Sequence, residues 1–166
     1  MDVIEDIQVT AYKIPTDFPE ADGTLQWNST TLILVALEGG GHKGIGYTYA
    51  DISTAYFIQS ALKEIISGKD LMNIPSISES LIGAIRNNGN CGIAMMAVSA
   101  VDTALWDLKS KVLNLPLCEL LGKAKNEIRV YGSGGFTSYI DNQLKDQLEG
   151  WMRNGIQHIK IKIGSR

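Results

Sequence analysis

Apolar and polar positions alternate through the first third of the chain, which is the pattern of β-strands that bury one face. The first stretch runs from about residue 4 to 14, and we expect it to end at Pro15 in a loop that continues through Pro19 and Gly23. A second stretch, residues 30–37, is rich in β-branched and apolar side chains, and a third follows at residues 43–49. The pattern predicts an antiparallel meander.

Five glycines lie between residues 39 and 46. Their order fits neither Gly-x-Gly-x-x-Gly at the start of a helix nor a phosphate-binding loop with Gly-Lys-Ser/Thr. We therefore interpret them as a hairpin turn that uses the freedom of the glycine backbone, and we predict no nucleotide site.

After residue 53 the apolar positions recur every three to four residues, which predicts helices. Two helices are expected over about 53–67 and 76–86, and a short helical turn over 117–121. The strongest stripe, on a third helix that ends before Pro116, consists of Ile93, Met96, Ala97, Ala100, Val101, Ala104, Leu105 and Leu108. Its small residues permit close packing, and Met95 and Met96 are interpreted as core fillers.

A boundary is expected near Ala124. Beyond it the pattern predicts a strand over 128–132, a loop over 133–138, a helix over 141–154 and a strand over 156–163. This order is a βαβ unit, in which two parallel strands are joined by a right-handed crossover. The chain is thus divided into residues 1–124 and 125–166.

The last predicted strand carries Lys160 and Lys162 on one face, and Ile159, Ile161 and Ile163 on the other, which we expect to pack on helices. In parallel α/β folds, chemistry collects at the carboxyl ends of strands. In an enclosed site, desolvation and mutual repulsion would lower the pKa of the lysines, and such a lysine can act as a base near neutral pH. The alternative is an edge strand with a solvated lysine face, which protects against aggregation.

The composition is that of a globular protein, since 45% of the 166 residues are hydrophobic. A net charge of -3 without a basic run gives no support for a nucleic-acid partner, and no apolar stretch approaches the ~18 residues of a membrane span. The first residues lack a secretory signal, so the cytoplasm is expected. Cys91 and Cys118 are isolated, and we interpret them as reduced core residues rather than zinc ligands or disulfide partners.

The third helix contains the most specific motif of the chain. Residues 97–111 read Ala-Val-Ser-Ala-Val-Asp-Thr-Ala-Leu-Trp-Asp-Leu-Lys-Ser-Lys, and Pro116-Leu117 and Leu120-Leu121-Gly122 follow. Together with the meander, the βα order and the Lys-x-Lys strand, this motif resembles the mandelate racemase/muconate lactonizing enzyme branch of the enolase superfamily. One departure is Ser110, where that family usually has Gly or Ala.

The resemblance implies an α+β capping domain, an antiparallel meander with helices over residues 1–124, followed by the first βαβ unit of a modified TIM-type barrel over residues 125–166. The chain would then be truncated. It also implies abstraction of the proton α to a carboxylate, with the enediolate held on Mg²⁺; this superfamily is the standard example of such a Lys or His base working beside a metal. Lys162 matches the base, and Lys160 matches the lysine whose charge lowers the pKa of that base and stabilises the anion.

The same resemblance suggests four substrate-binding residues. Trp27 and Tyr47 would belong to the capping surface that closes over the substrate, and Ser133 and Gly134 would border the pocket. A structural role is an equal alternative for each of the four. The family's metal ligands are acidic residues that end later barrel strands, and no Asp or Glu follows Glu149, so no metal ligand is assigned and the chain alone is expected to be inactive.

The leading hypothesis is an enzyme that acts on a small-molecule carboxylate or acid sugar as a racemase, epimerase, cycloisomerase or dehydratase, and that assembles as a homo-oligomer. One alternative is a non-catalytic binding or interaction domain that retains the capping fold. Another is a structural α+β domain with solvated lysines. The sequence does not identify the carboxylate, the reaction or the number of subunits.

Overall fold

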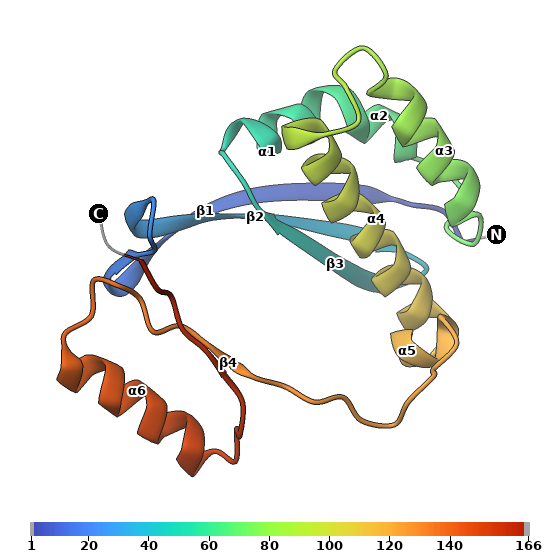
Figure 1. Ribbon diagram of the computed structural model, residues 1–166. Coiled ribbons are helices and arrows are strands. Elements are labelled where there is room, and N and C mark those ends of the chain that lie inside the picture. The colour runs from blue at the N-terminus through green and yellow to red at the C-terminus, as the bar shows by residue number, and fades with distance from the viewer. Residues whose placement is uncertain (1, 165–166) are drawn as a thin grey trace. The chain divides into compact units, whose positions relative to one another are not determined.

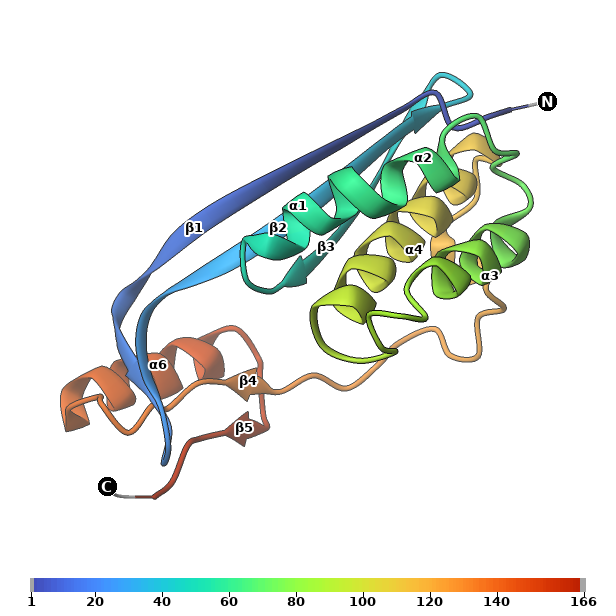
Figure 2. The same cartoon turned by 90° about the horizontal axis from the view of Figure 1, so that it is seen from above.

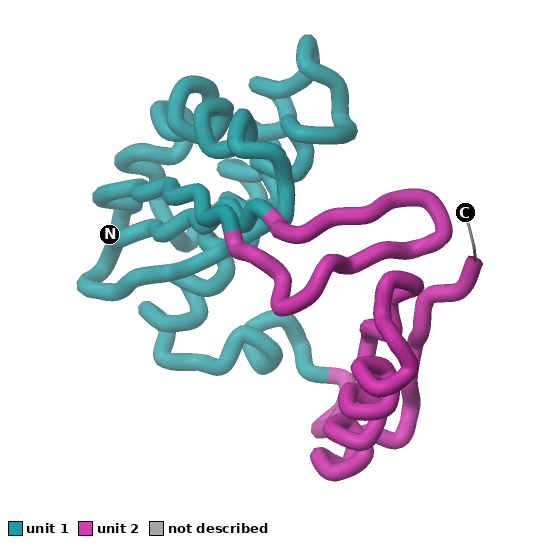
Figure 3. Tube along the Cα trace, turned by 90° about the vertical axis from the view of Figure 1, so that its left-hand side faces the viewer, with its two compact units in different colours: residues 1–13, 31–123 teal, residues 14–30, 124–166 magenta. Residues whose placement is uncertain are grey.

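The computed structural model describes residues 2–164 and divides the chain into two compact units. The first unit contains residues 1–13 and 31–123, and the second contains residues 14–30 and 124–166 (Figure 3). The predicted boundary near Ala124 falls at one junction between the units. Residues 14–30, which the sequence placed with the capping domain, are grouped with the C-terminal segment instead.

The sheet consists of β1 (Asp6–Ala21), β2 (Gln26–Gly39) and β3 (His42–Tyr49), in the order β1-β2-β3. Strands β2 and β3 pair antiparallel, with Leu32 opposite Tyr49 and Gly39 opposite His42. Gly40 and Gly41 form the turn with positive φ angles of 56° and 72°. The predicted meander is confirmed.

The first strand does not end at Pro15, as the sequence had suggested. It continues through Pro15 and Pro19 to Ala21, and the turn lies at residues 22–25. A proline lacks the N–H that a central strand must donate, but β1 is at the edge of the sheet, where one side of the strand needs no partner. The predicted loop is therefore a β-hairpin.

Helices cover one face of this sheet (Figures 1 and 2). The first helical segment joins α1 (Ser53–Phe57), the π-helical turn η1 (Ile58–Leu62) and α2 (Lys63–Ile66). The others are α3 (Ile74–Ala84), α4 (Gly92–Val112) and α5 (Leu117–Leu120). Each of these helices was predicted, with shifts of a few residues at the ends.

The core lies between the sheet and the helices. The sheet contributes Ile33, Val35 and Leu37, which are fully buried because they share one face of β2. Segments η1, α2, α3 and α4 contribute fully buried side chains: Ile58, Leu62, Ile66, Leu81 and Leu108.

Helix α4 packs directly on the backbone of β3, because Gly44 and Gly46 point toward it. A Cβ on Gly44 would lie 2.5 Å from the backbone oxygen of Ala104, and one on Gly46 would overlap the backbone oxygen of Ala100. These two glycines are therefore packing residues, and Gly40 and Gly41 are the ones that serve the turn.

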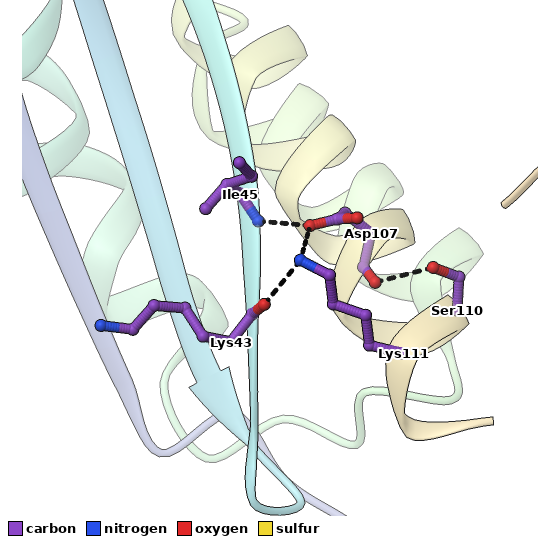
Figure 4. A network of polar contacts seen from close by, with 5 residues as sticks. All are labelled: Lys43, Ile45, Asp107, Ser110 and Lys111. Atoms are coloured by element: carbon purple, nitrogen blue, oxygen red, sulfur yellow. Dashed lines mark hydrogen bonds and ion pairs between the residues drawn. The ribbon is translucent and has the colours of Figure 1, made fainter. Parts of the chain in front are cut away.

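Side chains of α4 also satisfy the free edge of β3 (Figure 4). The Asp107 carboxylate accepts a hydrogen bond of 2.7 Å from the backbone N–H of Ile45. It also pairs with the Lys111 Nζ at 2.7 Å, and that ammonium donates a hydrogen bond of 2.9 Å to the backbone oxygen of Lys43. An exposed strand edge is thereby closed.

The structure corrects two predictions about the core. Met95 and Met96 are 37% and 41% exposed, because the buried stripe of α4 begins at Ala94 and Ala97 rather than at Ile93 and Met96. Cys91, the residue before α4, and Cys118, on α5, are free thiols but are exposed, since both lie near helix ends and not on buried faces.

The second unit contains β4 (Gly132–Ser133), α6 (Asp141–Arg153) and β5 (Ile159–Lys160), and the two strands are parallel. The order strand, helix, strand is confirmed, but both strands are much shorter than predicted, since their ladder covers only two residue pairs. Ile159, Ile161 and Ile163 are exposed and do not pack on helices as expected.

Candidate functional site

The predicted lysines lie on and just after β5. Ser133 is the pairing partner of Lys160, and the N–H of Gly134 donates a 3.1 Å hydrogen bond to the backbone oxygen of Lys160. The N–H of Lys162 donates a 2.9 Å hydrogen bond to the backbone oxygen of Gly135. The side chain of Lys160 is exposed, whereas Lys162 is half-buried. The structure therefore brings Lys160, Lys162, Ser133 and Gly134 to one end of the two strands.

Two consecutive glycines shape this end of β4. Gly135 adopts a positive φ of 57°, and a Cβ there would lie 2.5 Å from the Cγ2 of Ile161. A Cβ on Gly134 would lie 2.5 Å from the Oε1 of Gln147, the same oxygen that accepts a 2.8 Å hydrogen bond from the Gly135 N–H. Helix α6 thus fixes the loop after β4. The predicted role of Ser133 and Gly134 at a pocket wall stays a prediction.

Residues 14–30, hereafter the hairpin arm, are attached to the loop that follows β4. The backbone N–H of Thr137 donates a 2.9 Å hydrogen bond to the backbone oxygen of Ala21, and its hydroxyl donates one of 3.1 Å to the backbone oxygen of Asp22. The Ser138 hydroxyl donates a 2.6 Å hydrogen bond to the backbone oxygen of Pro19. The segment that the sequence predicted to be a loop is held at three points.

Four aromatic side chains extend the same attachment. The ring centroids of Trp27 and Phe136 are 5.6 Å apart, those of Phe136 and Tyr139 are 5.5 Å apart, and those of Phe18 and Tyr139 are 6.1 Å apart, all in edge-to-face geometry. The Trp27 Nε1 donates a 2.7 Å hydrogen bond to the Glu20 carboxylate. Burial, followed by the charge of Glu20, raises the pKa of Tyr139. Trp27 therefore anchors the arm, and its contact with substrate stays a prediction.

Asp22 builds the tip of the arm. Its Oδ1 accepts hydrogen bonds from the backbone N–H of Thr24 (2.7 Å), the Thr24 hydroxyl (2.8 Å) and the backbone N–H of Leu25 (2.8 Å). The backbone hydrogen bonds from Leu25 and Thr24 are the main reason that the pKa of the Asp22 carboxyl is lowered, and the positive charge of Lys162 lowers it further.

The tip lies against the chain that follows Lys162. A Cβ on Gly23 would be 3.3 Å from the backbone oxygen of Ile163, and a Cβ on Gly164 would be 3.3 Å from the Cα of Gly23. The two backbones can approach this closely because both residues are glycines. The sequence analysis did not select Asp22; the signal that could have found it is Asp-Gly between two strands, which is a strong hairpin-turn pair.

Tyr47, the remaining predicted site residue, lies in the first unit on the exposed face of β3. Its ring is 5.9 Å from that of Tyr49. Its assignment to a substrate-covering surface stays a prediction.

The described residues do not provide a metal site. Within residues 2–164, no three His, Cys, Asp or Glu side chains form a group that could hold a metal ion. On α6 the Glu149 carboxylate has other partners, since it pairs with Lys145 at 3.8 Å and with Arg153 at 3.7 Å. This part of the chain therefore does not fit Mg²⁺ by itself.

An α+β unit of meander and helices, followed by a parallel βαβ unit, defines the class of proteins in which a capping domain precedes a (β/α) barrel. The chain belongs to the mandelate racemase/muconate lactonizing enzyme family, since residues 6–122 match its N-terminal domain. Across residues 2–164, no helix has the length and apolar character needed to cross a membrane.

Known proteins of this family are similar to the chain in sequence and in structure. A mandelate racemase/muconate lactonizing enzyme-like protein from Rubrobacter xylanophilus is 51% identical, with a TM-score of 0.94 over 98% of this chain and 45% of its own. The 3,6-anhydro-alpha-L-galactonate cycloisomerase of Streptomyces coelicolor is 32% identical over 98% of this chain and 46% of its own length. The L-talarate/galactarate dehydratase of Salmonella typhimurium is 36% identical over 75% of this chain and 32% of its own length.

A crystal structure of the Salmonella dehydratase, with a TM-score of 0.86 at 29% identity over 99% of this chain and 45% of that one, is liganded with Mg and L-lyxarohydroxamate. The present chain spans less than half the length of the relatives that it matches. It is similar to enzymes of this superfamily that differ in their reactions.

Proposed function

We propose that the complete polypeptide containing this chain abstracts the proton α to a carboxylate of a small acid. The observation that carries the proposal is the position of Lys162. It follows the parallel strand β5 at its carboxyl end, which is where the catalytic residues of (β/α) barrels lie. The tip of the hairpin arm contacts the backbone directly after it. Membership of the family supports the same reaction type.

In this proposal Lys162 receives the proton through its Nζ, and Lys160, the last residue of β5, contributes positive charge. A carbon acid is much weaker than an ammonium group, so a base alone cannot drive the reaction, and charge must stabilise the oxyanion as it forms. Mg²⁺, which is named in the Salmonella structure, would supply that charge in the complete protein. We place its ligands outside residues 1–166 and therefore propose that these residues alone are inactive.

The proposed substrate is a carboxylate or acid sugar. The names of the relatives include dehydratases of talarate, galactarate and arabinonate, and a cycloisomerase of an anhydro-galactonate, and these names support this class of substrate. Racemisation, epimerisation, cycloisomerisation and dehydration all begin with the same proton abstraction. A homo-oligomeric state and a cytoplasmic location stay predictions.

The test is exchange of the substrate α-proton with deuterated solvent, measured by NMR on the complete polypeptide with a panel of acid sugars. We expect Lys162→Met to slow the exchange by at least ~10²–10⁴-fold, the usual contribution of a general base, while the circular dichroism spectrum stays unchanged. The control is Lys145→Met, which removes an exposed lysine of α6 and should leave exchange unchanged. Undiminished exchange in Lys162→Met with both enantiomers of a substrate would reject Lys162 as the base.

A further inference from the structure

Gln147, on α6, is linked to the proposed base through the backbone of Gly135. Its Oε1 accepts a 2.8 Å hydrogen bond from the N–H of Gly135, and the backbone oxygen of Gly135 accepts a 2.9 Å hydrogen bond from the N–H of Lys162. Two consecutive hydrogen bonds therefore connect the helix to the residue that is proposed to receive the proton. All three residues belong to the second unit.

The hydrogen bond at Lys162 lies beyond the regular strand pairing. The ladder of β4 and β5 ends with the pair Ser133 and Lys160. The N–H of Lys162 finds its acceptor in Gly135, which belongs to the loop after β4 and not to the strand. The backbone position of Lys162 thus depends on the conformation of this loop.

Gly135 needs an external partner to keep its conformation. Its φ of 57° is in the left-handed region, and a Cβ there would lie 2.5 Å from the Cγ2 of Ile161, so the position requires glycine. Glycine is also the residue whose backbone most readily adopts other conformations. Because Gly135 is buried, its N–H would be costly without a partner, and the oxygen of Gln147 both satisfies this N–H and favours the observed conformation.

The side chain of Gln147 packs closely on the same loop. A Cβ on Gly134 would lie 2.5 Å from its Oε1 and 2.8 Å from its Nε2, so the missing side chain of Gly134 makes room for the amide. Gln147 is half-buried, and Gly134 is buried beneath it. The acceptor is therefore held against the backbone group that it binds.

We infer that Gln147 is a positioning residue for Lys162, because it holds the loop of Gly134 and Gly135 in the conformation that accepts the Lys162 N–H. The inference rests on the proposed function, in which Lys162 is the base, and it assigns Gln147 no contact with the substrate. A displacement of about 1 Å in a reacting group can cost ~10²-fold in rate. Loss of this hold should therefore lower kcat and leave KM nearly unchanged.

The experiment measures exchange of the substrate α-proton on the complete polypeptide, with a panel of acid sugars that includes galactarate and arabinonate. Gln147→Leu removes the acceptor and keeps a similar helix propensity, and Gln147→Glu retains an acceptor on a side chain of the same length. The matched control is Gln143→Leu. The Oε1 of Gln143 also accepts a backbone N–H, that of Ile140 at 3.1 Å, but this bond serves the start of α6.

A second measurement does not depend on activity. Amide hydrogen exchange is followed by mass spectrometry in the peptides that contain Gly135 and Lys162. We expect Gln147→Leu to speed exchange in both peptides by about two- to tenfold, the range for one lost hydrogen bond, and to lower kcat by about 10- to 100-fold with less than about a twofold change in KM. Gln147→Glu should restore most of kcat. Gln143→Leu should leave kcat and both peptides unchanged, although it removes a helix cap.

An unchanged kcat in Gln147→Leu, unchanged amide exchange at Lys162, or an equal loss of kcat in Gln143→Leu would overturn the inference. Circular dichroism checks that each variant is folded. If Gln147→Leu does not fold, Gln147→Asn replaces it, because its amide is one methylene shorter and cannot reach Gly135, and the same outcomes apply. A wild-type polypeptide that exchanges no α-proton would reject the proposed function, and amide exchange at Lys162 would still decide whether Gln147 holds this residue.

Discussion

Single residues of α4 explain why its motif is so specific. Asp102 accepts a hydrogen bond from the Ser78 hydroxyl, which joins α4 to α3. Lys109 donates a 2.8 Å hydrogen bond to the backbone oxygen of Met72 and lies 5.5 Å from the centre of the Trp106 ring. Ser110, the departure from the family pattern, is buried but satisfied, since its hydroxyl donates to the backbone oxygen of Asp107 at 2.8 Å. The residues of this motif hold α4 in place in the fold, and we assign none of them a catalytic role.

The same scale yields a prediction for Gly46. We expect Gly46→Ala to lower the free energy of unfolding by about 1–3 kcal/mol, because the new methyl group would overlap the backbone of α4 and force the helix away from β3. The measurement is urea denaturation followed by circular dichroism.

The matched control is Gly83→Ala on α3. A Cβ there meets no atom within 4 Å, and the φ of Gly83 is not positive. Alanine in a helix should therefore raise the free energy of unfolding by about 0.4–1 kcal/mol. Equal effects of the two substitutions would show that α4 does not depend on direct contact with β3.

At the scale of elements, the edge strand β3 is closed by side chains instead of by a further strand. Asp107 and Lys111 lie one turn apart on α4 and therefore point the same way, toward the free N–H of Ile45 and the free C=O of Lys43 (Figure 4). Both backbone groups of this exposed edge are thereby occupied, so the arrangement blocks pairing with another chain.

We predict that Asp107→Ala lowers the free energy of unfolding by about 1–2 kcal/mol, because the hydrogen bond from Ile45 to a charged group is lost and Lys111 loses its ion pair. Amide exchange of Ile45 should become faster at the same time. The comparison is Glu38→Ala, which removes the more exposed ion pair between Glu38 and Lys43 and should cost less than about 1 kcal/mol. Unchanged protection of Ile45 would contradict the edge-closing role.

At the scale of the whole molecule, the chain crosses between the two units three times. Strand β1 begins in the first unit and β2 ends there, whereas the hairpin arm that joins them belongs to the second unit. The segment 124–131 connects the units without helix or strand, and Ile128 within it is 86% exposed. This segment is exposed backbone outside helices and strands, where proteolytic cleavage is favoured.

Limited proteolysis should therefore cut first between residues 124 and 131, as exposed backbone without hydrogen-bonded structure is the preferred substrate of proteases. We further expect the two fragments to elute together in native size-exclusion chromatography, because the hairpin arm remains bound to the C-terminal fragment through Thr137, Ser138 and the aromatic contacts. Trp27→Ala should weaken this association. Separation of the wild-type fragments directly after the cut would contradict the division of the chain into these units.

The sequence determined the elements and the family, because both depend on local patterns. Alternation predicted the meander, a period near 3.6 predicted the helices, and residues 97–111 carried the resemblance that the match of residues 6–122 confirms. It also placed Lys160 and Lys162 after a crossover helix on a parallel strand, which is a consequence of chain order alone. Their catalytic roles stay predictions.

Only the tertiary structure decided which surfaces meet. Pro15 reads as the end of a strand, but it is tolerated because β1 lies at an edge, and edge position is a property of the sheet and not of the residue. The sequence predicted Gly44 and Gly46 to be turn residues. In the structure, α4 occupies the space that their side chains would need. Asp22 and Lys162 are 140 residues apart, and their charges interact only because two glycines let the hairpin tip approach the chain after β5. Local patterns contain no information about contacts at such separations, so the neighbourhood of the lysines could not be read from the sequence.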